Sequence, residues 1–285
     1  MEENSILNLQ WYPGHMAKTR RVIAENLKLV DIVLEIADAR IPQSSRNPDL
    51  AAILGTKPRL LILNKIDIAD ANATAQWEKK LTAQGENVLC ADCLSGAGLN
   101  KLMPKIQNVL SEKLERFKSR GLTGLAVRAM VVGVPNSGKS SLINRLAGQK
   151  AAKVEDRPGV TRTKQWIHAG KQLELLDTPG ILWPKFEDKQ VGLHLAFTGA
   201  VRDEVTDIET LASELLKVLA AKYPDALTAR YKMTPDASAE GIDLLYQLCR
   251  KRGFIMAGNE PDTERGAKIL LDEFRGGKLG RITLE

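Results

Sequence analysis

The sequence Gly133-Val134-Pro135-Asn136-Ser137-Gly138-Lys139-Ser140 decides how this chain folds. It fits the pattern GxxxxGK[ST] and directly follows an apolar run at residues 126–132 (AVRAMVV). In that setting the glycines let backbone N–H groups curl around phosphates, at the positive end of a helix that begins near Lys139. We therefore predict a phosphate loop at 133–140. The residues expected to contact the nucleotide there are Asn136, Ser137, Gly138, Lys139, Ser140 and Ser141.

Two later segments carry the groups that accompany such a loop. In Asp177-Thr178-Pro179-Gly180, the aspartate closes an apolar run and supplies an acidic group near Mg²⁺, and Gly180 can bring its N–H to the γ-phosphate without a Cβ in the way. Residues 158–162 (PGVTR) offer Thr161 as a further metal ligand, with Thr163 as a close rival. The predicted Mg²⁺ ligands are Ser140, Thr161 and Asp177. Lys139, at the β- and γ-phosphates, and Thr161 are assigned catalytic roles.

A second motif, Asn64-Lys65-Ile66-Asp67, follows another apolar run and is the pattern of a guanine-recognition tetrad. An aspartate carboxylate accepts from N1–H and the exocyclic amino group of guanine, whereas adenine leaves the buried charge unpaired, which is costly. Asn64 is expected to brace the loop and the Lys65 stem to cover the ring. Residues 92–96 (DCLSG) are expected to flank the guanine carbonyl, with Asp92 and Cys93 as nucleotide contacts through the main chain.

The order of these motifs is unusual, because the guanine tetrad precedes the phosphate loop. A circular permutation of the P-loop GTPase domain explains that order, and the charged segment at residues 111–124 is the predicted connection between the former chain ends. Apolar runs alternate with helical spacing, which predicts an α/β fold with a mainly parallel sheet and motifs at its carboxyl edge. The predicted strands lie at residues 32–37, 60–63, 88–90, 126–132 and 173–176. This domain is predicted to span residues 1–187.

Residues 188–285 are predicted to form a small all-helical domain. Thr206-Asp207-Ile208-Glu209 fits a capping box, and Pro224 is expected to stop the helix that follows. A second helix is expected to end at Gly253 and a third at Gly276. Basic residues of this tail are candidates for phosphate contacts with RNA: Arg250, Lys251, Arg252, Arg265, Lys268, Arg275, Lys278 and Arg281.

Composition excludes several classes of protein. The 285 residues contain 44% hydrophobic residues, as in globular proteins, and no apolar run approaches the ~20 residues that span a bilayer. The acidic N-terminus resembles neither a signal nor a transit peptide, so we expect a cytoplasmic protein without membrane contact. Cys90-Ala91-Asp92-Cys93 has CxxC spacing, but the scattered remaining ligands favour small residues at a strand end over zinc or redox chemistry.

The net charge is +6, and its distribution is uneven. Residues 1–187 carry 27 Lys and Arg against 19 Asp and Glu, whereas residues 188–285 carry 14 against 16. A basic surface raises encounter rates with polyanions, so nucleic acid is a possible partner, although many enzymes are equally basic.

The motif order, together with Trp11-Tyr12-Pro13-Gly14-His15-Met16-Ala17-Lys18, resembles bacterial YlqF-type circularly permuted GTPases, the ribosome biogenesis GTPase A family. The similarity continues through Asp38-Ala39-Arg40-Ile41-Pro42 to the closing residues 280–285 (GRITLE). The resemblance implies a GTPase that binds GTP and GDP and acts on precursors of the large (50S) ribosomal subunit. It also implies that the helical domain contacts ribosomal RNA. We expect a monomer.

The hydrolytic step needs a group that orients water, and Ile181 stands where Ras-like GTPases carry a glutamine. We assign that role to His15, in a glycine-containing loop that the ribosomal particle would order; the alternative is an RNA-contacting loop in which Trp11, Tyr12 and Lys18 matter more. His168 falls in a predicted strand (WIHAG) and His194 in a predicted helix, which favours structural roles for both.

Asn136 is the position at which cation-activated relatives bind K⁺, so K⁺ is a second predicted cofactor beside Mg²⁺. The alternative is an asparagine that suits the loop geometry. Two other functions stay open: a GTP-gated RNA-binding scaffold with negligible hydrolysis, and a P-loop kinase or transferase, against which the guanine tetrad argues.

Overall fold

The computed structural model describes residues 21, 23–122, 124–148, 166–177, 188–201, 203 and 207–285, and the structural statements below concern these residues. They belong to two compact units, one within Trp11–Lys185 and the other within Phe186–Leu284. We call them the sheet unit and the helical unit and describe each by itself. The domain boundary predicted after residue 187 falls at residues 178–187, outside the described part, so it stays a prediction.

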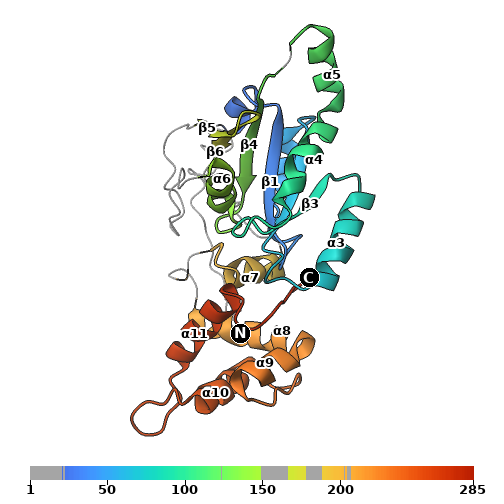
Figure 1. The fold of residues 1–285 in the computed structure, drawn as a ribbon. Coiled ribbons are helices and arrows are strands. Elements are labelled where there is room, and N and C mark those ends of the chain that lie inside the picture. Colours follow the sequence, from blue (N-terminus) through green and yellow to red (C-terminus); the bar gives the residue numbers. More distant parts are fainter. Residues whose placement is uncertain are drawn as a thin grey trace. The chain divides into compact units, whose positions relative to one another are not determined.

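The sheet unit is built on one six-stranded sheet with the strand order β3-β2-β1-β4-β6-β5 (Figure 1). All neighbouring strands are parallel except β5 and β6, which are antiparallel. The predicted α/β fold with a mainly parallel sheet is therefore confirmed. The strands are β1 (Ile32–Asp38), β2 (Arg59–Asn64), β3 (Val88–Cys90), β4 (Val127–Gly133), β5 (Trp166–Ala169) and β6 (Leu173–Asp177).

Strand β1 shows why the sequence folds in this way. It pairs with β2 on one side and β4 on the other, and all seven of its residues are buried. Ile32, Leu34 and Ile36 join a core with α4 (Leu102–Val109) and α6 (Lys139–Ala147) on one face. Val33 points to the other face, into a core that includes α2 (Pro48–Leu54). A parallel strand covered on both faces explains the almost continuous apolar run.

The remaining helices of the sheet unit are α3 (Ala71–Ala83), the 3₁₀ helix η1 (Leu99–Lys101) and α5 (Ser111–Ser119). Helix α3 begins at Asp70, whose carboxylate accepts from the N–H groups of Asn72 and Ala73. Helix α5 buries none of its residues fully. The segment 111–124, predicted as the connection between the former chain ends, is thus largely an exposed helix (Figure 1).

The helical unit contains α7 (Lys189–Phe197), α8 (Ile208–Lys222), α9 (Pro224–Tyr231), α10 (Gly241–Arg252) and α11 (Thr263–Arg275). The predicted ends at Gly253 and Gly276 are confirmed. Two details differ from the prediction. Asp207 caps α8, with its carboxylate accepting from the N–H groups of Glu209 and Thr210. Pro224 follows the end of α8 and also opens α9, because proline is well suited to the first turn of a helix.

No helix within the described ranges is both long and apolar enough to cross a bilayer. The three thiols are free, and burial raises the pKa of Cys90 and of Cys93 to about 12. No three His, Cys, Asp or Glu side chains in the described part of the chain gather as a metal site would require. The CxxC spacing therefore marks two packed residues, at the end of β3 and just beyond it.

Candidate nucleotide-binding site

Five parallel strands end at the same edge of the sheet, and polar or flexible residues occupy those ends. This edge is where open α/β sheets bind ligands. Each strand contributes its last residue. These residues are Asp38 in β1, Asn64 in β2, Cys90 in β3, Gly133 in β4 and Asp177 in β6.

The phosphate loop leaves β4 at Gly133 and enters α6 at Lys139. A Cβ at Gly133 would lie 2.4 Å from the carbonyl oxygen of Ile36, and a Cβ at Gly138 would lie 2.0 Å from Nδ2 of Asn64. Gly138 also has a φ of 104°, which disfavours side chains. Both glycines are therefore required by close packing against neighbouring strands.

Lys139 lies buried within this loop. Its Nζ donates to the carbonyl oxygens of Gly133, at 3.1 Å, and Val134, at 2.7 Å. Burial lowers the pKa of Lys139 to about 8, with a smaller contribution from the Lys65 ammonium and an opposing one from the Asp177 carboxylate. The side chain is thus a cation at neutral pH, surrounded by main-chain oxygens at the point where phosphates bind in such loops.

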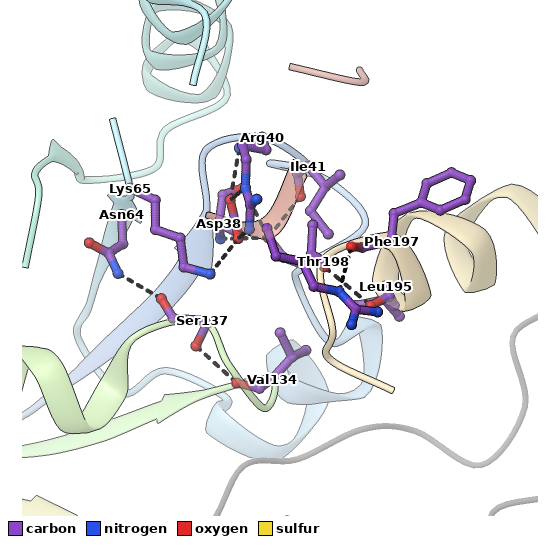
Figure 2. A network of polar contacts seen from close by, with 12 residues as sticks. Asp38, Arg40, Ile41, Asn64, Lys65, Val134, Ser137, Leu195, Phe197 and Thr198 are labelled. Atoms are coloured by element: carbon purple, nitrogen blue, oxygen red, sulfur yellow. Dashed lines mark hydrogen bonds and ion pairs between the residues drawn. The ribbon is translucent and has the colours of Figure 1, made fainter. Parts of the chain in front are cut away.

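Asn64 connects three loops through one buried amide. Its Nδ2 donates to the carbonyl oxygen of Ser137 at 2.7 Å, and its Oδ1 accepts from the N–H of Cys93 at 2.9 Å. Ser137 in turn donates its hydroxyl to the carbonyl oxygen of Val134 at 2.9 Å. Asn64 therefore fixes the guanine tetrad against the phosphate loop, as Figure 2 shows, and against the loop after β3.

The loop after β3 is folded by Asp92. Its carboxylate accepts from the N–H groups of Leu94, at 2.8 Å, and Ser95, at 3.1 Å. Burial opposes the charged form, but the hydrogen bonds from Ser95 and Leu94 outweigh it and lower the pKa of Asp92. Asp92 and Cys93 are both predicted to contact the nucleotide through the main chain, and that contact stays a prediction. Leu94, in the same loop, is 78% exposed.

Lys65 and Asp67 complete the guanine tetrad. Asp67 is exposed, whereas the ammonium of Lys65 lies 2.9 Å from Oδ2 of Asp38. Asp38 also accepts from Arg40, through Nε at 3.0 Å and Nη2 at 2.7 Å, and both of these side chains are almost fully buried. Figure 2 shows Lys65 and Arg40 reaching the same carboxylate from different loops.

Asp38 and Arg40 were not predicted as site residues. A charged Asp-Ala-Arg directly after a buried strand, at the carboxyl edge, is the signal that could have located them. Burial raises the pKa of Asp38, but the Arg40 guanidinium and the Lys65 ammonium outweigh burial and hold that pKa well below its usual range.

The described groups fit a magnesium site of the P-loop type. Asp177 pairs with Val131 across β4 and β6, which places it beside the phosphate loop, and Ser140 is the second residue of α6. A hydroxyl and a carboxylate are hard oxygen ligands of the kind that Mg²⁺ takes together with substrate phosphates. Asn136 has a φ of 57°, a left-handed conformation that asparagine tolerates well, which supports the loop-geometry explanation for this residue.

The other predicted site residues are distributed as follows. His15, Thr161 and Gly180 lie outside the described residues, so their roles stay predictions. Ser141 lies in the first turn of α6, half-buried. The other two histidines lie away from the phosphate loop in the sequence. His168 is exposed on β5, 3.6 Å from Glu174, and His194 is buried in α7 beside the ring of Phe197.

Comparisons with known proteins agree with this geometry. Residues 128–230 match the family described as "50S ribosome-binding GTPase". That stretch contains the phosphate loop and not the guanine tetrad, as the permuted order requires.

One similar protein is ribosome biogenesis GTPase A of Bacillus pumilus, which is 45% identical over 98% of this chain and 99% of its own length. Among solved structures, GDP-bound YlqF has a TM-score of 0.70 and 26% identity, covering 93% of this chain and 98% of its own. GNP-bound YlqF from T. maritima has a TM-score of 0.65 and 27% identity, covering 94% and 97%. The chain therefore belongs to the ribosome biogenesis GTPase A family of circularly permuted GTPases, and it is a GTP hydrolase.

Proposed function

We propose that this GTPase is an assembly factor for the large (50S) ribosomal subunit, which hydrolyses GTP to GDP and phosphate in response to the ribosomal particle. The observation that carries the proposal is the match to ribosome biogenesis GTPase A over almost the whole of both chains, with an intact guanine tetrad and phosphate loop. The "50S ribosome-binding GTPase" family match supports the choice of the large subunit. We expect this work to take place in the cytoplasm, by a monomer.

In this proposal the chain's own residues divide the work at the nucleotide. Asn64, Lys65 and Asp67 hold the guanine, and Lys139 neutralises the β- and γ-phosphates. Ser140, Asp177 and Thr161 would hold Mg²⁺, which stabilises charge on the phosphates when bound, and Gly180 would meet the γ-phosphate. Because Ile181 cannot hydrogen-bond to water, His15 is proposed to orient the nucleophile once the ribosomal particle has ordered its loop.

The helical unit offers a restricted set of contacts for ribosomal RNA. Arg275 serves the fold: its guanidinium bonds to the Asp203 carboxylate at 2.7 Å and to carbonyl oxygens at the end of α7. By contrast, Arg250 and Lys251 are exposed on α10 and line one shallow pocket together with Tyr246, an aromatic ring that is 41% exposed. Two cations beside an accessible aromatic ring suit a phosphate backbone and an unpaired base.

The first experiment compares GTP hydrolysis by the purified chain alone, with 30S subunits, with mature 50S subunits and with 50S precursors, all in K⁺ buffer. Stimulation by a large-subunit particle and not by 30S subunits is expected. Equal rates in all four reactions, with GTP binding intact, would contradict the proposal. Repeating the measurement in Na⁺ buffer tests the predicted role of K⁺ as a cofactor, because a K⁺-assisted hydrolysis must be slower when Na⁺ replaces K⁺.

The competing function is a GTP-gated RNA-binding scaffold with negligible hydrolysis, which the lack of a glutamine after Asp177-Thr178-Pro179-Gly180 favours. Stimulated turnover by the wild-type chain would exclude the scaffold, and His15→Ala then tests the residue that orients water. If the assembly GTPase is the correct function, this variant binds GTP and the particle normally but loses the stimulated turnover. Full stimulated turnover would remove His15 from the mechanism.

A further inference from the structure

A charge cluster centred on Asp38 lies at the nucleotide edge. Asp38 is one carboxylate between two cations, Arg40 and Lys65. Arg40 alone satisfies both of its oxygens, because Nε and the backbone N–H of Arg40 bond to Oδ1 and Nη2 bonds to Oδ2. The Lys65 ammonium is a second cation on the same carboxylate, and taking it out of water has a desolvation cost. The presence of Lys65 on Asp38 therefore calls for a functional explanation.

The backbone of Lys65 adopts an uncommon conformation. Its φ is 66°, a left-handed conformation that is costly for a residue with a Cβ. Asn64, the preceding residue, is the register partner of Asp38 across β1 and β2. With its Cα just beyond β2 and its Nζ on Asp38 at the end of β1, the Lys65 stem crosses the carboxyl edge between the two strands (Figure 2).

Other charges act on the same ammonium. The Asp67 carboxylate, which recognises guanine, favours the charged form of Lys65, although burial and Arg40 hold the pKa of Lys65 below its usual value. Lys65 in turn disfavours the charge on Lys139 in the phosphate loop. If Asp38 were neutral, the attraction of the Asp67 carboxylate would act on the Lys65 ammonium without the opposing attraction of Asp38.

We propose that Asp38, held in place by Arg40, is a positioning residue for guanine recognition. It anchors the Lys65 ammonium, so that the Lys65 stem keeps one position beside the base and the ammonium competes little with guanine for the Asp67 carboxylate. Asp38 acts through Lys65 and not by touching the nucleotide. The selectivity for guanine thus depends on a residue of β1 outside the guanine tetrad.

The test measures the affinities of the full chain for GTP and for ITP, which lacks the exocyclic amino group, by isothermal titration calorimetry. Asp38→Asn is expected to lower the GTP affinity about tenfold, the scale of one charge-assisted hydrogen bond, and to lower the ITP affinity less. The GTP/ITP affinity ratio therefore falls. In the Lys65→Met background the same substitution is expected to leave the ratio unchanged, because the competing ammonium has been removed.

Glu35→Gln is the matched control, since Glu35 is an equally buried carboxylate in the middle of β1 that is bonded to Arg46 and Arg59. It is expected to leave the GTP/ITP ratio at the wild-type value. An equal loss of GTP and ITP affinity in Asp38→Asn would overturn the proposal. A GTP/ITP ratio that is lower in the double variant than in Lys65→Met alone would also overturn it.

Asp38→Glu, which keeps the charge and lengthens the arm, extends the test in case Asp38→Asn does not fold. It must give a smaller fall in the ratio, again abolished by Lys65→Met; an unchanged ratio would count against the proposal. These measurements need no ribosomal particle, so their outcome is independent of the proposed role in assembly.

Discussion

Strand β1 carries two buried carboxylates three residues apart, and their ionic partners differ. Glu35 meets Arg46 and Arg59 at 3.3 and 3.2 Å, and both guanidiniums also bond to Glu86, so two anions face two cations. Asp38, at the nucleotide edge, contacts the two cations Arg40 and Lys65. The Glu35 cluster joins residues of the fold to one another, whereas the Asp38 cluster includes Lys65 of the predicted guanine tetrad.

The largest effect is expected where the Glu35 cluster is broken. Glu35→Ala leaves Arg46 and Arg59 without their buried partner, so the free energy of unfolding should fall by about 3–5 kcal/mol, as for other broken buried pairs. Urea unfolding followed by circular dichroism measures the loss. The folded fraction that remains in buffer should bind GTP with wild-type affinity.

Glu86→Gln is the matched variant of the outer carboxylate, whose side chain is 18% exposed. It keeps a hydrogen-bond acceptor for both arginines, so a loss of roughly 1 kcal/mol is expected. Equal losses of unfolding free energy in Glu35→Ala and Glu86→Gln would show that the deeper burial of Glu35 does not increase its contribution to stability.

The next effect concerns the packing of the nucleotide edge. Gly138→Ala would place a Cβ 2.0 Å from Nδ2 of Asn64 and must displace the amide that joins three loops. We expect nucleotide affinity to fall by about a hundredfold, which corresponds to roughly 2.7 kcal/mol.

Gly85→Ala is the control for this substitution. Gly85 also has a positive φ, 85°, but a Cβ there would meet no atom within 4 Å, and the residue adjoins the Glu86 end of the sheet. Strain alone should lower stability by about 1 kcal/mol without changing the nucleotide affinity. If Gly138→Ala bound GTP as well as Gly85→Ala does, the close approach of Asn64 would not matter.

The last effect is a dependence of stability on pH that arises from Lys139. Its pKa is lowered from the ordinary 10.5 to about 8 in the fold, so between these values the unfolded chain binds more protons than the folded one. The free energy of unfolding of nucleotide-free protein should therefore rise with pH over that window, by roughly 3 kcal/mol, relative to Lys139→Met. Chemical denaturation of both proteins from pH 7.5 to 10.5 measures the difference.

Bound GDP should abolish this dependence, because its phosphates favour the charged lysine and raise the pKa toward its ordinary value. A difference between wild type and Lys139→Met that stayed constant with pH would contradict the assignment. The free energy difference must also carry this sign, since a fall with rising pH would require a raised pKa.

The strand ends could be predicted from the sequence because local patterns determine them. Each apolar run predicted as a strand is one, and the polar residues that follow Leu63 and Leu176 stand at the carboxyl edge as expected. The position of the loop between β4 and α6 was equally predictable, since the glycine spacing specifies the backbone directly. The family that the motif order indicated is confirmed.

Features that depend on tertiary contacts could not be predicted from the sequence. Asp38 and Arg40 have the composition of an exposed turn, and only the pairing of β1 with β2 reveals that Lys65 completes their cluster. The role of the Asp92 carboxylate in folding its own loop was not predicted, and the predicted main-chain contact of Asp92 with the nucleotide stays a prediction. Helix α9 was missed because a proline can either end one helix or begin another, and only the path of the chain distinguishes them.

The amide of Asn64 has a consequence for synthesis of the chain. Its bond to Ser137 joins residues 73 positions apart, and β1 receives its second neighbour, β4, from the same later segment. A nascent chain that ends near α5 would expose one edge of its central strand, with apolar residues on both faces. We expect such a fragment to need chaperone protection, because unpaired edges of this kind promote aggregation. In this permuted order, the segment with the predicted guanine tetrad is synthesised before the segment with the phosphate loop that packs against it.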